Sequence, residues 1–203
     1  MLPVFDIQRL RFGVDGDGVR TLVGLAGCGL RCRYCLNPHS WNGSVKVTGY
    51  TPEELYEIVR VDDLYFRTTG GGVTFGGGES LLHMDAICRF AQLCPGDWSL
   101  WAETSLSVPE ENVIQAANVL HHLLVDIKTM NPKVYRDYTG ADPELTYRNL
   151  QLLLKLVGPR RITVRLPMIP GFTTGTQVEK SAQILREMGV QDLDYLTYET
   201  QIL

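Results

Sequence analysis

Short apolar runs alternate with longer segments of helical pattern along most of the chain. Runs rich in β-branched and aromatic residues predict strands, and six such runs are found, at residues 20–27, 72–77, 98–104, 123–128, 161–169 and 193–199. Between them, apolar residues recur at three- and four-residue spacing. That spacing predicts helices, over residues 51–67, 81–94, 108–123, 131–157 and 174–190.

This alternation of strand and helix predicts an α/β fold. Parallel strands joined by right-handed crossover helices are the usual outcome of such an order. Six strands are fewer than the eight of a complete (β/α)8 barrel, so the pattern leaves open a doubly wound sheet and a partial barrel. No linker, repeat or low-complexity segment divides residues 1–203, and we expect a single domain.

Two threonines are placed where helices should begin. Thr51 precedes a proline and two glutamates, which is typical of the first turn of a helix. Thr176 precedes the segment QVEK and resembles the start of a capping box.

Composition and charge indicate an ordinary globular protein. Hydrophobic residues make up 44% of the chain and charged residues 21%, and the net charge is -4. This charge gives no basic surface for nucleic acid, and no apolar run approaches the length needed to span a membrane. The first residues, which include Asp6, do not resemble a secretory signal. We therefore expect a cytoplasmic protein whose partner is a small molecule or another protein.

Residues that carry chemistry follow the predicted strands. Three cysteines follow the first strand, the segment GGGES at 76–80 follows the second, Glu103 lies at the end of the third, and Asp126 and Lys128 lie at the end of the fourth. Parallel α/β folds gather their active sites at the carboxyl ends of their strands. These residues are therefore predicted to share one site.

The three cysteines, Cys28, Cys32 and Cys35, lie within eight residues of one another. A 4Fe-4S cluster held by three thiolates keeps one iron open to a ligand. A zinc ion is the alternative, because His39 could complete a Cys3His set. Two further cysteines, Cys88 and Cys94, lie in a helical segment, where we expect them to pack as small apolar residues.

Several segments together resemble one known family. FDIQRLRFGVDGDGVRTLVGLAGCGLRCRYCLNPHSW at residues 5–41 is similar to the opening of the glycyl-radical-enzyme activating enzymes, within the radical S-adenosylmethionine (radical SAM) superfamily. The similarity continues, in the family's order, through YTPEELYEIV, TTGGGVTFGGGESLL, WAETS, LLVDIKTMNPKVYRDYTG and RLPMIPGFT.

The resemblance implies a partial (β/α)6 barrel of the TIM type, the radical SAM fold. It implies a 4Fe-4S cluster on Cys28, Cys32 and Cys35, with S-adenosylmethionine chelating the open iron. Reductive cleavage of that cofactor would give a 5'-deoxyadenosyl radical, which would abstract hydrogen from a glycine of a partner glycyl radical enzyme. A low-potential donor such as flavodoxin or ferredoxin would supply the electron.

The resemblance also assigns residues to S-adenosylmethionine. Gly77, Gly78 and Glu79 would meet the methionine ammonium, and Lys128 would meet its carboxylate. Further contacts are implied for Glu103 and Asp126, beside the sulfonium or a bound monovalent cation, and for Tyr34, beside the adenine. If Arg165 points into the barrel, it needs an anionic partner.

Four features depart from the family pattern. Ser80 replaces a proline, Glu103 replaces an aspartate, and Glu199 lies where relatives often have a histidine, so we assign no cofactor contact to Glu199. No ferredoxin-like insert with a second cysteine cluster lies between Cys35 and Gly70, which predicts one cluster. The end at Leu203 leads us to expect a wide lateral opening.

Two other functions remain open at this stage. One is radical chemistry on a small molecule, which would need no partner protein. The other is a zinc-stabilised interaction module with Cys28, Cys32, Cys35 and His39 as ligands.

Overall fold

A computed structural model describes residues 1–197 of the chain. They contain one eight-stranded sheet with the order β3-β1-β2-β4-β5-β6-β7-β8. Neighbouring strands from β2 to β8 are parallel: β2 (Val19–Leu25), β4 (Gly72–Gly77), β5 (Ser99–Thr104), β6 (His122–Asp126), β7 (Ile162–Met168) and β8 (Asp192–Thr197). These are the six strands predicted from the sequence, with ends that differ by at most two residues; the last two residues of the strand predicted over 193–199 lie outside the described residues.

Two strands were not predicted. β1 (Leu2–Phe12) pairs antiparallel with β2, and β3 (Thr48–Tyr50) pairs antiparallel with β1. In β1 only Leu2 and Val4 are fully buried, and the second half of the strand is mostly exposed. A strand with so few buried positions gives a weak alternating pattern, because the pattern depends on one face being apolar.

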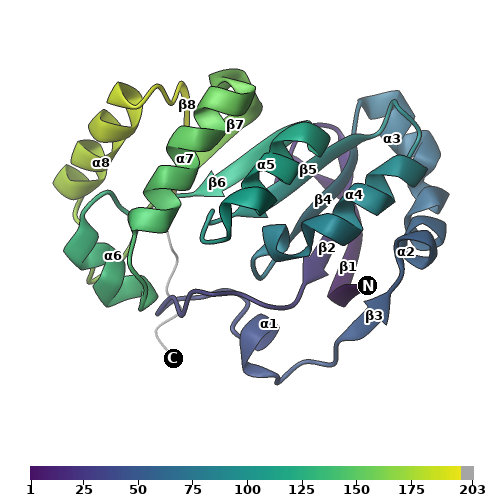
Figure 1. The fold of residues 1–203 in the computed structure, drawn as a ribbon, viewed down its shortest axis with the longest axis horizontal. Coiled ribbons are helices and arrows are strands. Elements are labelled where there is room, and N and C mark those ends of the chain that lie inside the picture. The colour runs from purple at the N-terminus through teal and green to yellow at the C-terminus, as the bar shows by residue number, and fades with distance from the viewer. Residues whose placement is uncertain (198–203) are drawn as a thin grey trace.

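The helices connect the parallel strands in sequence (Figure 1). They are α1 (His39–Asn42), α2 (Pro52–Val59), α3 (Asp63–Thr69), α4 (Met84–Leu93), α5 (Glu110–Val119), α6 (Pro132–Thr139), α7 (Glu144–Val157) and α8 (Gly175–Glu187), with 3-10 turns at Arg60–Asp62, Ser80–His83 and Pro159–Arg161. The helix predicted over 131–157 is two helices, because Gly140 takes a left-handed conformation with φ of 73° and ends α6.

One of the two predicted caps is confirmed. Thr51 forms a capping box with Glu54 at the start of α2: Glu54 N donates to Thr51 Oγ1 at 3.1 Å, and Thr51 N donates to Glu54 Oε2 at 2.8 Å. The prediction at Thr176 is wrong. Thr174 caps α8 and forms the box with Gln177, which places the helix start two residues earlier.

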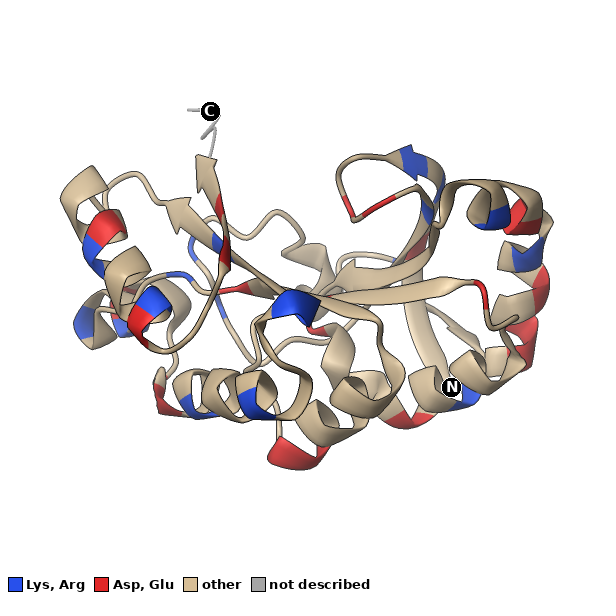
Figure 2. Ribbon diagram, turned by 90° about the horizontal axis from the view of Figure 1, so that it is seen from above, with Lys and Arg blue, Asp and Glu red and all other residues tan. Residues whose placement is uncertain are grey.

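The sheet is curved, and helices pack on its convex side (Figure 2). Alternate residues of each strand face these helices and form the apolar core, for example Val73 and Phe75 on β4 and Leu123 and Val125 on β6. The six parallel strands with their helices form the expected partial (β/α)6 barrel, to which β1 and β3 add an antiparallel edge.

The other face of the strands carries polar and charged side chains as well as Trp101. Thr74, Trp101, Glu103 and Arg165 lie at the alternate positions of β4, β5 and β7, which face the concave side. Polar side chains inside a barrel need partners, and several are supplied by the strands themselves. The fold thus places the apolar core outside the barrel and leaves its interior for charged groups.

Charged residues of both signs are interspersed along the outer helices (Figure 2). Among residues 1–197, no helix is long and apolar enough to cross a membrane.

Candidate active site

A cavity of about 530 Å³ opens at the carboxyl ends of the parallel strands. Every residue predicted from the sequence to bind a cofactor or metal lines it, with the exceptions of Glu79 and of His39, the fourth ligand of the zinc alternative. The lining members of that set are Cys28, Cys32, Tyr34, Cys35, Gly77, Gly78, Glu103, Asp126 and Lys128. The prediction that one end of the sheet collects these groups is confirmed.

The cysteine loop is held at its start and in its middle by backbone hydrogen bonds. At its start, Gly27 N donates to Ser40 O at 2.8 Å, which closes the loop on α1. Further along, Arg31 N donates to Thr139 O at 2.8 Å and Arg33 N donates to Tyr138 O at 3.1 Å. The last turn of α6 therefore fixes the middle of the loop.

All five cysteines in the described chain are thiols. Burial raises the pKa of Cys28, and it raises the pKa of Cys32 to about 11, although Lys128 opposes this rise. These two thiols are therefore protonated at neutral pH, and binding of iron releases their protons. Cys88 and Cys94 pack against the apolar core, as predicted.

The zinc arrangement is not formed. Among residues 1–197, no three His, Cys, Asp or Glu side chains converge on a position for a single metal ion. His39 does not line the cavity, and its ring packs edge-on against Phe5 with centroids 5.0 Å apart. In a 4Fe-4S cluster each thiolate binds a different iron, so three thiols spread around one cavity suit a cluster better than a single ion.

Gly77 and Gly78 bring the end of β4 against the cysteine loop. A Cβ on Gly78 would lie 2.2 Å from Gly27 O, and one on Gly77, whose φ is 93°, would lie 2.7 Å from the Phe5 ring. Gly78 N donates to Leu25 O at 2.9 Å. Only glycine allows this approach, and it exposes backbone, without side chains, to the cavity.

The Glu79 side chain does not line the cavity and instead accepts hydrogen bonds from the end of β5 and the residue after it. Its side chain is 1% exposed and accepts hydrogen bonds from Thr104 Oγ1 at 2.6 Å, Ser105 Oγ at 2.6 Å and Ser105 N at 2.8 Å. Burial raises the pKa of Glu79, and these donors oppose the rise. In this structure the carboxylate ties the turn after β4 to the end of β5.

Two ion pairs line the strand ends. Arg165 Nη1 lies 2.7 Å from Glu103 Oε1, and Lys128 Nζ lies 3.1 Å from Asp126 Oδ2. Burial raises the pKa of Glu103, and the Arg165 guanidinium opposes this rise. Arg165 therefore points into the barrel and has the anionic partner that was expected. Together the pairs offer both signs of charge to a zwitterionic ligand.

Tyr34 lies among aromatic side chains at the edge of the cavity. Its ring meets Phe172 edge-on at 6.0 Å and Tyr138 at 6.2 Å, measured between centroids. The side chain is 39% exposed. A flat ring supported in this way is suited to pack against a planar ligand group.

Glu199 lies outside the described residues. Several lining residues were not predicted, among them Arg11 and Asp15 of the β1-β2 hairpin. Thr74 Oγ1 donates to Asp15 O at 2.8 Å, and a Cβ on Gly16 would lie 2.5 Å from Trp101. The hairpin loop thus folds into the barrel. The sequence signal was GVDGDG, whose glycines allow the close approach.

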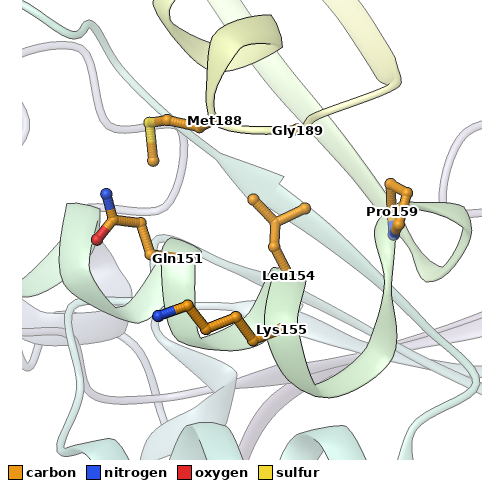
Figure 3. Close-up of a pocket in the computed structure, with 6 residues that line it drawn as sticks. All are labelled: Gln151, Leu154, Lys155, Pro159, Met188 and Gly189. Atoms are coloured by element: carbon orange, nitrogen blue, oxygen red, sulfur yellow. The ribbon is translucent and has the colours of Figure 1, made fainter.

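A second cavity, of about 570 Å³, lies at the other end of the sheet (Figure 3). Leu154 and Lys155 of α7 line it, together with Pro159, which precedes β7, and Gly189, which precedes β8. It contains none of the predicted site residues. Because it lies at the amino ends of the strands, it is separate from the site of the cysteines.

The model of the radical SAM superfamily matches residues 22–191 of this chain. The chain belongs to this superfamily. The match covers the cysteine loop and β4 to β7, the part of the chain that builds most of the cavity. The superfamily's cofactors are a 4Fe-4S cluster and S-adenosylmethionine.

Within the superfamily, this radical SAM protein is similar to activating enzymes. It is 32% identical to the pyruvate formate-lyase-activating enzyme of Clostridium pasteurianum, over 92% of this chain and 78% of that protein. It is 27% identical to the pyruvate formate-lyase 2-activating enzyme of Escherichia coli (strain K12), over 96% of this chain and 76% of that protein. The resemblance seen in the sequence is confirmed.

A solved structure gives the same result. A domain of pyruvate-formate lyase-activating enzyme from Bacteroides vulgatus ATCC 8482 superimposes with a TM-score of 0.56 at 26% identity. The match covers 64% of this chain and 83% of that one. The radical SAM fold that the resemblance implied is therefore confirmed as well.

Proposed function

We propose that this radical SAM protein is a glycyl-radical-enzyme activating enzyme, acting as a single domain over residues 1–203. The observation that carries the proposal is the joint placement of three cysteine thiols and two ion pairs in one cavity, in a chain similar to activating enzymes over most of its length.

Cys28, Cys32 and Cys35 would hold the 4Fe-4S cluster. When bound, the cluster and S-adenosylmethionine supply the radical that abstracts hydrogen from a glycine of the partner enzyme. The cavity that the three thiols share has room beside them. The described residues fit a cluster because three thiols carried by one loop line a single cavity.

The remaining lining residues would bind and orient S-adenosylmethionine. Lys128 would meet the methionine carboxylate, and the backbone of Gly77 and Gly78 would accept from the ammonium. Glu103 and Asp126 would attract the sulfonium, or a monovalent cation beside it. Tyr34 would pack on the adenine. Glu79 would act indirectly, because its carboxylate positions the loops that carry these groups.

The electron would come from a low-potential carrier such as flavodoxin or ferredoxin. Arg31 and Arg33 are exposed on the cysteine loop, next to the thiols that would bind the cluster. Two cations at this place would attract a carrier with an acidic face.

The cytoplasm is the compartment we propose. Five cysteines that are all thiols in the described chain suit a reducing environment. The net charge of -4 favours a protein partner over nucleic acid, and we propose no membrane association.

Electron paramagnetic resonance tests the proposal. The anaerobically reconstituted protein is mixed with S-adenosylmethionine, a reductant and candidate glycyl radical enzymes. The expected result is the doublet of a glycyl radical, lost in Cys32→Ala and kept in Cys88→Ala. Deoxyadenosine formed at full rate with no partner protein, and no doublet with any partner, would favour a small-molecule substrate and refute the proposal.

A further inference from the structure

Two residues, Ala26 and Gly27, join β2 to the first cysteine, and their four backbone groups are all hydrogen bonded. Ala26 N donates to Pro3 O at 2.8 Å, and Gly27 N donates to Ser40 O at 2.8 Å. Gly27 O accepts from Glu79 N at 2.7 Å. These three groups have backbone partners, whereas the fourth, the carbonyl of Ala26, accepts from a side chain.

That side chain is His83, the last residue of the 3-10 turn Ser80–His83. Its Nε2 lies 2.8 Å from Ala26 O, and because a carbonyl oxygen can only accept, the ring nitrogen is the donor. Burial lowers the pKa of His83, so the ring is neutral at neutral pH and Nε2 carries its single N–H. The ring also packs beside Gly27, since a Cβ there would lie 3.8 Å from Nε2.

The core fixes the backbone on both sides of His83. Leu81 and Met84 are fully buried and belong to the apolar core. The ring of His83 is half-buried and lines a separate cavity of about 350 Å³, which none of the cysteines lines. A side chain anchored in this way holds its hydrogen-bond acceptor at a defined position.

We propose that His83 is a positioning residue for the 4Fe-4S cluster: its Nε2–H holds Ala26 O and thereby fixes where the Cys28 thiolate meets its iron. The inference goes beyond the proposed function and rests on it only in requiring that the cluster binds at these cysteines. Hydrogen bonds outside the ligand set orient the ligands of a metal centre, and removing them weakens metal binding. His83 would act through the backbone before Cys28, without touching the cluster.

Asn112 offers a matched control for His83. It lines the same cavity of about 350 Å³, and its Nδ2 donates to a backbone carbonyl of the same 3-10 turn, Leu81 O, at 2.6 Å. That carbonyl is not part of the cysteine loop. Removing either side-chain donor leaves one backbone carbonyl without its partner, so both changes should lower the stability of the protein by similar amounts. Only the change at His83 should affect the cluster.

The test compares His83→Leu, His83→Gln and Asn112→Leu as reconstituted holoenzymes, without S-adenosylmethionine or a partner enzyme. In His83→Leu, iron is expected to pass to a chelator about fivefold faster than in the wild type, because one hydrogen bond that holds the loop is lost. The electron paramagnetic resonance spectrum of the reduced cluster should change as well, since it depends on how the ligands are placed. His83→Gln keeps an N–H donor and should restore both properties. Asn112→Leu should match the wild type in both.

Urea denaturation before reconstitution separates this role from a general loss of stability, because the two leucine variants should unfold at similar urea concentrations. Equal iron transfer and equal spectra in His83→Leu and Asn112→Leu would overturn the inference. So would a His83→Gln protein that behaves like His83→Leu, because the N–H would then not be what positions the loop. The glycyl radical assay is separate, so failure of the proposed partner chemistry would leave these results unchanged.

Discussion

Arg165 on β7 and Glu103 at the end of β5 form an ion pair, with 2.7 Å between Nη1 and Oε1, that crosses β6 inside the barrel. Their side chains are 13% and 23% exposed. A charge this far from water depends on its partner, because removing one member leaves the other uncompensated.

Replacing Arg165 by Met is therefore expected to lower the free energy of unfolding by about 3 kcal/mol. Arg165 opposes the rise in the pKa of Glu103 that burial causes, so the variant raises this pKa further. A carboxyl group whose pKa is higher in the folded state than in the unfolded state stabilises the folded protein at low pH. This contribution is lost as the pH rises through the folded-state pKa. Urea denaturation should therefore show a smaller loss of unfolding free energy at about pH 5 than at about pH 8.

The double variant Arg165→Met with Glu103→Gln is the control for this experiment. It removes both charges, and it should recover most of the lost stability together with its pH dependence. If Arg165→Met loses the same free energy of unfolding at both pH values, the substitution does not raise the pKa of Glu103, and the prediction is wrong.

Gly78→Ala is expected to displace the cysteine loop, since the new Cβ would lie 2.2 Å from Gly27 O. Overpacking of this kind costs about 1–3 kcal/mol, measured by denaturation, and should lower the iron bound on reconstitution. Gly96→Ala is the matched control, because nothing lies within 4 Å of its Cβ position. Equal stability and iron content in the two variants would contradict this account.

Lys128→Met is expected to weaken binding of S-adenosylmethionine about tenfold, the loss of a hydrogen bond between charged groups. Lys128 lines the cavity beside Asp126, whereas Lys133 is exposed and pairs with Asp137 on α6. Equilibrium dialysis against the holoenzyme measures the effect, and Lys133→Met is the control. Equal affinities would remove Lys128 from the binding site.

Alanine at Cys28, Cys32 or Cys35 is expected to abolish cluster assembly, because each thiolate binds one iron. Alanine at Cys88 should leave it intact, since that thiol packs against the core. Iron and sulfide analysis after anaerobic reconstitution gives the result. Full cluster content in Cys35→Ala, for instance, would mean that another ligand serves the third iron.

The six parallel strands and the residues at their ends could be predicted from the sequence, because both depend on local pattern. β-branched runs define the strands, and the chain order then places Cys28, Gly77, Glu103 and Asp126 at one end of the sheet. The spacing of the cysteines needs no tertiary contact, since all three lie on one loop. These features are local, and that is why they were confirmed.

Tertiary contacts decided which of the predicted site residues face the cavity. Glu79 carries the family's motif position, yet its carboxylate is taken up by Thr104 and Ser105 of the next strand's end, partners that no local pattern specifies. Spacing along the chain determined which groups share the site, whereas burial and hydrogen-bond partners, which depend on residues distant in sequence, decided which of them face the cavity.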